Sequence, residues 1–419
     1  MNPLARVLID MGYEVSGSDI KENLYTLKLK EMGAQIFYGH NESNIRVADL
    51  IVISTAITSD NVEYRTAVSN GIPILKRAEL LSFIMDEHTH RIAVCGTHGK
   101  TTVSCFLSHF LVKEEKDPSF IIGATLRQNQ LSSNYGRKEY CVAEADESDR
   151  SFLFLNPTIM IITNIEEEHL DEYSGLDDIL STFNEFIGRL HPPDSLLIVC
   201  GDDPNIAKLK ISGITVISYG FGSSNLVQAR NLILKNNRIY YDVYIQNELV
   251  AEHIHLNIPG THNVLNSLTV FALSHFLRFP FSHVLSSFHD FQGASRRFHL
   301  VGKVNNIEVY DDYAHHPTEI ACTLEAAKTF GRRVIAVFQP HRFTRFSAFF
   351  NRFPESLKLA DFVVATEVYA AGEKNESGLT TKQLVAKMDS ARTLYIKNAG
   401  AIAGKLVPLL LPGDLVITL

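Results

Sequence analysis

A glycine-rich turn that carries a lysine is the part of the sequence whose residue types best suit chemistry. An apolar run precedes the turn and a helical pattern follows it. The turn consists of Gly96, Thr97, His98, Gly99, Lys100, Thr101 and Thr102. Glycines let backbone N–H groups approach phosphates, a helix N-terminus adds positive potential, Lys100 adds a point charge, and Thr101 offers a hydroxyl to Mg²⁺. We therefore predict a nucleotide-binding loop, with an ordinary strand-to-helix turn as the alternative.

Acidic residues and a histidine follow the next two apolar runs. Glu144 opens the run EADESD, beside the place where a neighbouring strand would carry the glycine-rich turn. A divalent cation takes oxygen ligands and can bridge nucleotide phosphates, so Glu144 is a candidate Mg²⁺ ligand. His169, in NIEEEHLD, could bind a second Mg²⁺ or its water, although Mg²⁺ prefers oxygen. A solvated acidic turn and a structural histidine are the alternatives.

Amides and an arginine later in the chain could complete a nucleotide site. Asn263 and Asn266 share one face of a predicted helix that starts at His262, where both amides could reach a base or a ribose. Arg297 lies in a presumed linker between domains, from which its guanidinium could swing onto the γ-phosphate when the domains close. A capped helix start and a solvated basic pair are the alternatives.

Two dense polar clusters, DDYAHHP and QPHRFTR, follow strands of the last third of the chain. The clusters include Asp312, His315, His316, His341, Arg342 and Arg345. The two arginines come from one helix start and suit a small carboxylate, which each could bind with a fork of N–H donors. A basic surface turn is the alternative.

These turns all follow short β-rich runs, so the elements around them predict the fold. Apolar runs alternate with helical patterns, which is typical of parallel α/β sheets that bind ligands beyond the carboxyl ends of their strands. We predict an α/β protein of three domains. Residues 1–89 form an incomplete Rossmann-like domain, residues 90–294 a central P-loop ATPase-like parallel sheet with an antiparallel addition, and residues 295–419 a Rossmann-like C-terminal domain.

Composition narrows the class of protein. The 419 residues include 39 Lys and Arg against 47 Asp and Glu, a net charge of −8, which argues against nucleic acid or an acidic membrane surface as the main partner. The five cysteines form no C-x-x-C pair. The sequence has no signal peptide and no apolar run of about 20 residues. We therefore expect a cytoplasmic protein without a membrane partner.

The ordered motifs resemble those of the Mur ligases. The matching runs are GTHGKTT, EADESDRSFL, TNIEEEHLD, GTHNVLN, DDYAHHPTE and PHRFTR. They cover the central and C-terminal thirds almost throughout, and GSDI at residues 17–20, STAI near Thr55 and RAEL near Arg77 extend the match into the first third. Within the family, the resemblance is strongest to members that join L-alanine to UDP-N-acetylmuramate.

The resemblance implies ATP-dependent amide formation between UDP-N-acetylmuramate and L-alanine through an acyl phosphate, in peptidoglycan precursor synthesis. The first domain would bind the UDP substrate, the central domain ATP with Mg²⁺, and the last domain the amino acid. Mg²⁺ is implied at Thr101, Glu144 and His169. ATP is implied at the glycine-rich turn and at Asn263, Asn266, Arg297 and Asp312, and catalysis at Lys100, Glu144, His169 and Arg297. Substrate binding is implied at Ser18, Asp19, Thr55, Ala56, His315, His316, His341, Arg342 and Arg345.

Two alternatives stay open at this point. A murein-recycling ligase, which attaches a tripeptide to UDP-N-acetylmuramate, is the nearest rival, although EADESD followed by SFL is more typical of the L-alanine enzymes. An inactive remnant that only binds ATP is the second. The residue that takes the proton from the amine could be His169, His315, His316 or solvent. We expect a monomer or a weak homodimer.

The two ends of the chain depart from the family pattern. Related chains open with a strand and a glycine-rich G-x-G-x-x-G-M turn that meets the uridine diphosphate, whereas Met1 stands here where the methionine of that motif would be. The last run, DLVITL, stops before an expected glycine turn and closing helix. We expect a mis-assigned start codon and a truncated end, and an in-frame stop codon directly upstream of Met1 would exclude the first idea.

Overall fold

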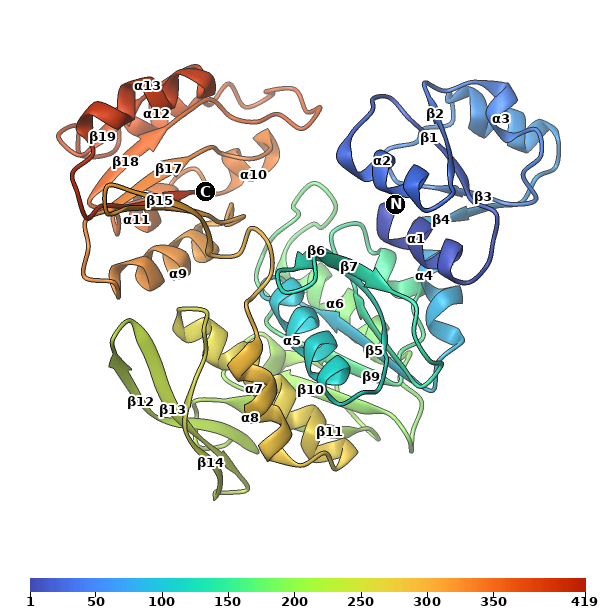
Figure 1. Cartoon of the computed structure of the whole chain (residues 1–419), viewed down its shortest axis with the longest axis horizontal. Coiled ribbons are helices and arrows are strands. Elements are labelled where there is room, and N and C mark those ends of the chain that lie inside the picture. Colours follow the sequence, from blue (N-terminus) through green and yellow to red (C-terminus); the bar gives the residue numbers. More distant parts are fainter.

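Strand β5 (His90–Cys95) lies inside a ten-stranded sheet, between β8 (Tyr140–Glu144) and β9 (Ile159–Ile162). It runs parallel to both neighbours, so the loops that follow the three strands leave the sheet at the same edge. These strands are short runs of buried apolar residues, as expected for a parallel sheet covered on both faces. The computed structural model describes all residues, 1–419, and confirms the predicted three-unit α/β architecture (Figure 1).

The central unit combines a parallel and an antiparallel part in one sheet. Its strand order is β14-β13-β12-β11-β10-β9-β5-β8-β6-β7, and β12, β13 and β14 pair antiparallel, as the alternating pattern of this region predicts. The remaining elements are α5 (Lys100–Lys113), β6 (Ser119–Leu126), β7 (Leu131–Asn134), α6 (Leu176–Ile187), β10 (Leu196–Cys200), β11 (Thr215–Gly220), β12 (Val227–Lys235), β13 (Arg238–Ile245), β14 (Glu248–His255), α7 (Thr261–Leu277) and α8 (Phe281–Asp290).

The N-terminal unit holds four short strands in two separate parallel pairs, β1–β2 and β3–β4. The sequence predicted an incomplete Rossmann-like domain for this unit, and no strand lies between the two pairs to join them. The elements are α1 (Asn2–Asp10), β1 (Ser16–Asp19), α2 (Leu24–Glu31), β2 (Gln35–Tyr38), β3 (Ile51–Ile53), α3 (Val62–Ser69), β4 (Ile74–Lys76) and α4 (Arg77–Asp86).

The C-terminal unit is a six-stranded sheet in the order β15-β16-β20-β17-β18-β19, parallel except for the β15–β16 hairpin. The elements are β15 (His299–Val304), β16 (Ile307–Asp311), α9 (Pro317–Lys328), β17 (Val334–Phe338), α10 (Phe343–Ala348), α11 (Phe353–Leu357), β18 (Phe362–Ala365), α12 (Thr381–Val385), β19 (Thr393–Tyr395), α13 (Ile402–Leu406) and β20 (Leu415–Thr418).

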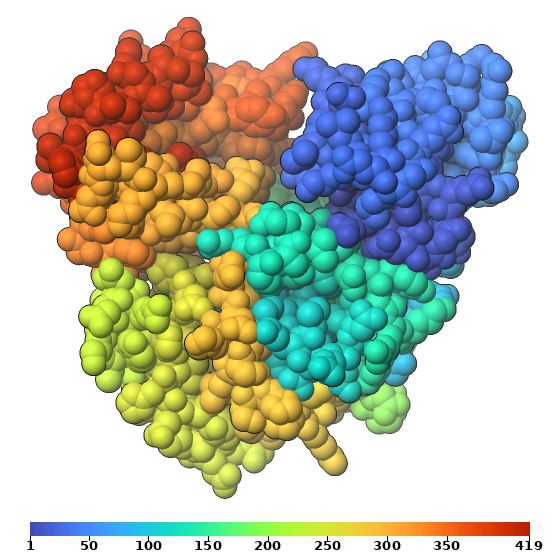
Figure 2. Space-filling model, viewed as in Figure 1, coloured from blue at the N-terminus to red at the C-terminus, as the bar shows by residue number.

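The apolar cores show how the units are joined. Leu4 and Val7 of α1 and Ile84 of α4 belong to the same apolar cluster as the central sheet, whereas the C-terminal unit has apolar clusters of its own. A hollow separates the N-terminal and C-terminal units above the central unit (Figure 2). No helix of the structure is both long and apolar enough to span a membrane.

Candidate functional site

The lysine of the glycine-rich turn is folded back onto its own loop. Lys100 Nζ donates hydrogen bonds to the carbonyl oxygens of Gly96 at 2.7 Å and Thr97 at 3.1 Å, and it forms an ion pair with Glu147 Oε1 at 2.9 Å. Burial by itself lowers the pKa of Lys100, but the negative charges of Glu147 and Asp146 outweigh it and hold that pKa well above its ordinary value. The lysine therefore stays charged, close to where a phosphate would bind.

The backbone of the turn is held by the loop that follows β9. His98 N donates to Asn164 Oδ1 at 2.8 Å, while Asn164 Nδ2 at 2.9 Å and Thr163 Oγ1 at 2.6 Å donate to the carbonyl oxygen of His98. Gly96 has φ +121°, and a Cβ at this position would overlap Thr163 Oγ1. The glycine is therefore required both by its backbone conformation and by the close approach of the next loop.

The residues predicted to bind Mg²⁺ lie beside this turn, but they do not form one group. Thr101 Oγ1 donates to Glu144 Oε1 at 2.8 Å, and the backbone N–H of Gly123 donates to Glu144 Oε2 at 2.7 Å. His169 Nε2 lies 3.7 Å from Glu147 Oε1, and burial lowers the pKa of His169. The hydroxyl of Thr101 and the carboxylate of Glu144 thus supply adjacent oxygen donors that suit Mg²⁺, whereas the imidazole of His169 faces a different carboxylate.

The residues predicted to reach the nucleotide line one cavity of about 110 Å³ between the central and C-terminal units. Asn263, Asn266, Arg297 and Asp312 all contribute to its wall together with Gly99 of the turn. Residues that the sequence did not single out also line the cavity, among them His262, Phe298, Glu319 and Cys322. Burial, together with the nearby positive charge of Arg297, lowers the pKa of His262 to about 4, so this ring is neutral at pH 7.

Asp312 is held in place by backbone donors. Its carboxylate accepts hydrogen bonds from Phe298 N at 2.6 Å and Ala314 N at 2.8 Å. Burial raises the pKa of Asp312 to about 6, although the positive charge of Arg297 opposes that rise. The aspartate therefore fixes the chain where the C-terminal unit begins.

The two arginines of the C-terminal cluster are paired with carboxylates in this structure. Arg345 Nε lies 2.7 Å from Glu168 Oε1, and both side chains are at most 9% exposed. Arg342 Nη2 lies 3.0 Å from Asp171 Oδ2, and its Nε lies 2.5 Å from Glu373 Oε1. Glu168 and Asp171 belong to the central unit, so the pairs cross from one unit to the other. A substrate carboxylate that binds to Arg342 and Arg345 would therefore contact guanidinium groups that already pair with Glu168, Asp171 and Glu373.

The three histidines of the C-terminal clusters occupy two environments. His341 Nδ1 lies 3.3 Å from Arg345 Nη1, and the rings of His315 and His341 are 5.9 Å apart. Burial lowers the pKa of His341 to about 4. His316 is instead fully buried, against the ring of Phe349 and the ring of His98. The structure therefore groups His315 and His341 with Arg345 and places His316 in the joint between the units.

The candidate substrate residues of the N-terminal unit lie at the carboxyl ends of its strands. Ser18 Oγ donates to Glu63 Oε2 at 2.6 Å and lies 3.1 Å from His40 Nδ1, so its contacts stay within the unit. Asp19 accepts from Lys21 N at 3.3 Å. Thr55 and Ala56 are exposed in the turn after β3. Their assignment to the UDP substrate stays a prediction.

Three family models of the Mur ligases together match nearly the whole chain. The model of the Mur ligase middle domain matches residues 94–274, that of the Mur ligase family catalytic domain residues 1–89, and that of the Mur ligase glutamate ligase domain residues 296–419. The chain belongs to the Mur ligase family. The predicted boundaries after residues 89 and 294 remain predictions, since the matches leave short gaps between them.

Similar proteins and solved structures agree with membership of this family. A UDP-N-acetylmuramate–L-alanine ligase of Pelotomaculum thermopropionicum is 40% identical, over 100% of this chain and 92% of the relative. One of Dictyoglomus turgidum is 39% identical, over 100% and 91%. The crystal structure of the Thermotoga maritima UDP-N-acetylmuramate–alanine ligase superposes with a TM-score of 0.84 at 27% identity, covering 100% of this chain and 92% of that one. A murein peptide ligase of Psychrobacter arcticus, with a TM-score of 0.73 at 24% identity over 100% and 92% of the chains, shares the fold.

Proposed function

We propose that this chain is an ATP-dependent ligase that joins the carboxylate of UDP-N-acetylmuramate to the amine of L-alanine, in peptidoglycan precursor synthesis. The observation that carries this conclusion is the 40% identity, over the full length of the chain, with a ligase of that activity. The geometry agrees with it, because the phosphate-binding turn faces a cavity shared with the C-terminal unit.

The reaction needs two anions to meet. A carboxylate oxygen of the muramate attacks the γ-phosphorus, the bond to ADP breaks, and an acyl phosphate forms. The amine of L-alanine then attacks the acyl carbon, phosphate leaves, and the nitrogen loses a proton. Lys100 and Arg297 would offset the negative charge of the first step, and this role is supported by the position of Lys100 in the turn and of Arg297 in the wall of the adjoining cavity.

The substrates would divide among the three units. ATP would lie along the turn and in the cavity of Asn263, Asn266 and Asp312. The guanidinium groups of Arg342 and Arg345, with His341 and His315, would bind the alanine carboxylate. The N-terminal unit would bind the UDP portion through the strand ends that carry Ser18, Asp19, Thr55 and Ala56.

Mg²⁺ fits part of the predicted ligand set. Thr101 and Glu144 would hold the ion, because the hydroxyl of Thr101, which is part of the turn, lies next to a carboxylate oxygen of Glu144. When bound, the ion would neutralise charge on the nucleotide phosphates. His169 remains the least favourable of the three proposed ligands, since its nitrogen is a poorer donor for Mg²⁺ than oxygen.

We place the protein in the cytoplasm and expect a monomer or a weak homodimer. The five cysteines are all free, and four of them are buried, which suits a reducing compartment. Sedimentation at several protein concentrations would test the oligomeric state.

A phosphate-release assay with omitted substrates tests the proposal. We expect release that requires ATP, UDP-N-acetylmuramate and L-alanine together. Release that a tripeptide supports better than L-alanine would instead indicate the recycling ligase. No release with any acceptor would indicate a remnant that only binds ATP.

A further inference from the structure

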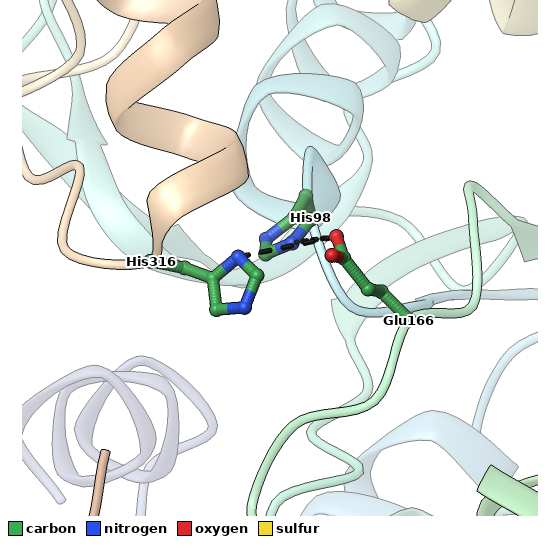
Figure 3. A group of neighbouring side chains, drawn as sticks. All are labelled: His98, Glu166 and His316. Atoms are coloured by element: carbon green, nitrogen blue, oxygen red, sulfur yellow. Dashed lines mark hydrogen bonds and ion pairs between the residues drawn. The ribbon is translucent and has the colours of Figure 1, made fainter. Parts of the chain in front are cut away.

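The imidazole ring of His98 lies between two carboxylates that come from different units. Its Nε2 is 3.2 Å from Glu166 Oε2 in the central unit (Figure 3), and its Nδ1 is 3.2 Å from Glu319 Oε1 in α9 of the C-terminal unit. A carboxylate oxygen only accepts hydrogen bonds, so each ring nitrogen must donate. This arrangement requires the doubly protonated ring, an imidazolium.

The surroundings favour that charged form. Burial by itself lowers the pKa of His98, but the hydrogen bonds with Glu166 and Glu319 outweigh burial and raise the pKa to about 9. Burial would raise the pKa of Glu166, yet its bonds with His98 and Arg352 hold that pKa well below its usual range. The ring therefore carries a positive charge at pH 7.

Glu319 connects the ring of His98 to Arg297, which has a proposed role in catalysis. Glu319 Oε1 also lies 3.8 Å from Arg297 Nη1, and Glu319 Oε2 accepts from the backbone N–H of His315 at 3.2 Å. One carboxylate thus faces His98 in the phosphate-binding turn, Arg297 beside the cavity, and the start of α9. A movement of α9 away from His98 would move Arg297 as well.

Polar contacts, and not a shared apolar core, hold the two units together here. The apolar clusters of the central and C-terminal units do not merge. Glu166 Oε1 lies 2.7 Å from Arg352 Nη2 and accepts from Thr318 Oγ1 at 2.9 Å, and both partners belong to the C-terminal unit. The loss of His98 would therefore remove the polar group that contacts acids of both units, Glu166 and Glu319.

We propose that His98 is a positioning residue, whose imidazolium clamps the C-terminal unit onto the phosphate-binding turn and thereby sets Arg297 through Glu319. The effect on turnover rests on the proposed ligase function, whereas the effect on domain closure does not.

A metal ion is the alternative occupant of this cluster. Ligand atoms of His98, Glu166 and His316 lie within 4.8 Å of one another. However, Arg352 already neutralises Glu166, and an imidazolium has no free nitrogen lone pair to bind a metal. The doubly protonated ring of His98 therefore leaves no metal site in this cluster.

The test compares the variants His98→Gln and Glu319→Gln and the double variant with the wild-type chain. The amide oxygen introduced by Glu319→Gln could still accept from the backbone at the start of α9, so this variant keeps the helix start while it removes the charge. The matched control is His283→Gln, which removes a histidine–glutamate contact of 2.9 Å between His283 and Glu114 inside the central unit. Small-angle X-ray scattering of the ligand-free proteins measures closure, and steady-state kinetics measure kcat and KM for L-alanine.

We expect both single variants to show a larger radius of gyration and a kcat/KM for L-alanine about tenfold lower than the wild type. The kcat/KM of the double variant should be no lower than that of the more impaired single variant. The control should match the wild type. An unchanged radius of gyration in His98→Gln and Glu319→Gln would overturn the clamp, as would fully additive losses. Stoichiometric Zn²⁺ binding that His98→Gln abolishes would also overturn it. A wild type without ligase activity would refute the proposed function alone, because the scattering comparison would still test the clamp.

Discussion

At the scale of single residues, the charge of Lys100 is balanced by a partner that the sequence did not identify. Glu147 lies in the same acidic run as Glu144, but it is Glu147 that pairs with the lysine, while Glu144 bonds to Thr101. The second oxygen of Glu147 is buried without a partner. Burial raises the pKa of Glu147 to about 7 even beside the lysine, so removal of the lysine would leave a buried acid that must take up a proton.

Lys100→Ala should affect stability as well as catalysis. We expect kcat to fall by about 10²- to 10³-fold, because the variant loses a cation at the transferring phosphate. We also expect the free energy of unfolding to fall by about 3–5 kcal/mol, because Glu147 loses its ion pair. The double variant Lys100→Ala with Glu147→Gln should recover most of the stability and none of the activity. Urea unfolding and phosphate release measure the two effects, and an unchanged unfolding curve for Lys100→Ala would contradict this account.

At the scale of elements, the parallel strands β5, β8 and β9 deliver their loops to one edge of the sheet, and close packing between two of those loops shapes the glycine-rich turn. A Cβ on Gly96 would overlap Thr163 Oγ1 and lie 2.8 Å from the backbone oxygen of Asn164. These same two residues hold the carbonyl oxygen of His98. The position of the turn is thus set by the neighbouring loop.

Gly96→Ala should disrupt this packing, and Gly213→Ala provides the matched control. Both glycines have positive φ, +121° and +73°, but a Cβ on Gly213 would meet nothing within 4 Å. We expect the control to lose about 1 kcal/mol of stability from backbone strain alone, and Gly96→Ala to lose about 3 kcal/mol or more together with ATP affinity. Thermal unfolding and nucleotide titration measure the difference, and equal losses in the two variants would disprove the importance of the packing.

At the scale of the whole molecule, charged groups hold the C-terminal unit against the central one. Arg345 with Glu168, Arg342 with Asp171, and His98 with Glu319 all cross this joint. The pairs Arg345–Glu168 and His98–Glu319 are largely buried, and buried pairs are screened less by salt than exposed ones, so these contacts should persist at physiological ionic strength. The joint should respond instead to pH, through the histidine.

The joint should weaken at alkaline pH. The pKa of His98 rises from 6.5 to about 9 in the folded chain, so the folded state binds the extra proton between these values. The stabilisation is therefore complete below about pH 6.5 and is lost as the pH rises through about 9, with an upper limit of about 3 kcal/mol. We expect the stability difference between wild type and His98→Gln, measured by urea unfolding, to be largest near pH 6.5 and to vanish near pH 10. A difference that stays constant over this range would exclude the imidazolium.

The α/β class, the three units, the glycine-rich turn between a strand and a helix, and the family could all be predicted from the sequence, because apolar periodicity and local motifs are properties of neighbouring residues. The family resemblance implied that Asn263, Asn266, Arg297 and Asp312 lie near one nucleotide, and they line one cavity. The folded chain was needed to show that Glu147 holds Lys100 and that Glu166 and Glu319 enclose His98. His98 and Glu319 are 221 positions apart. Spacing along the chain does not show which of many acids pairs with His98, because that pairing depends on how two separately folded units dock.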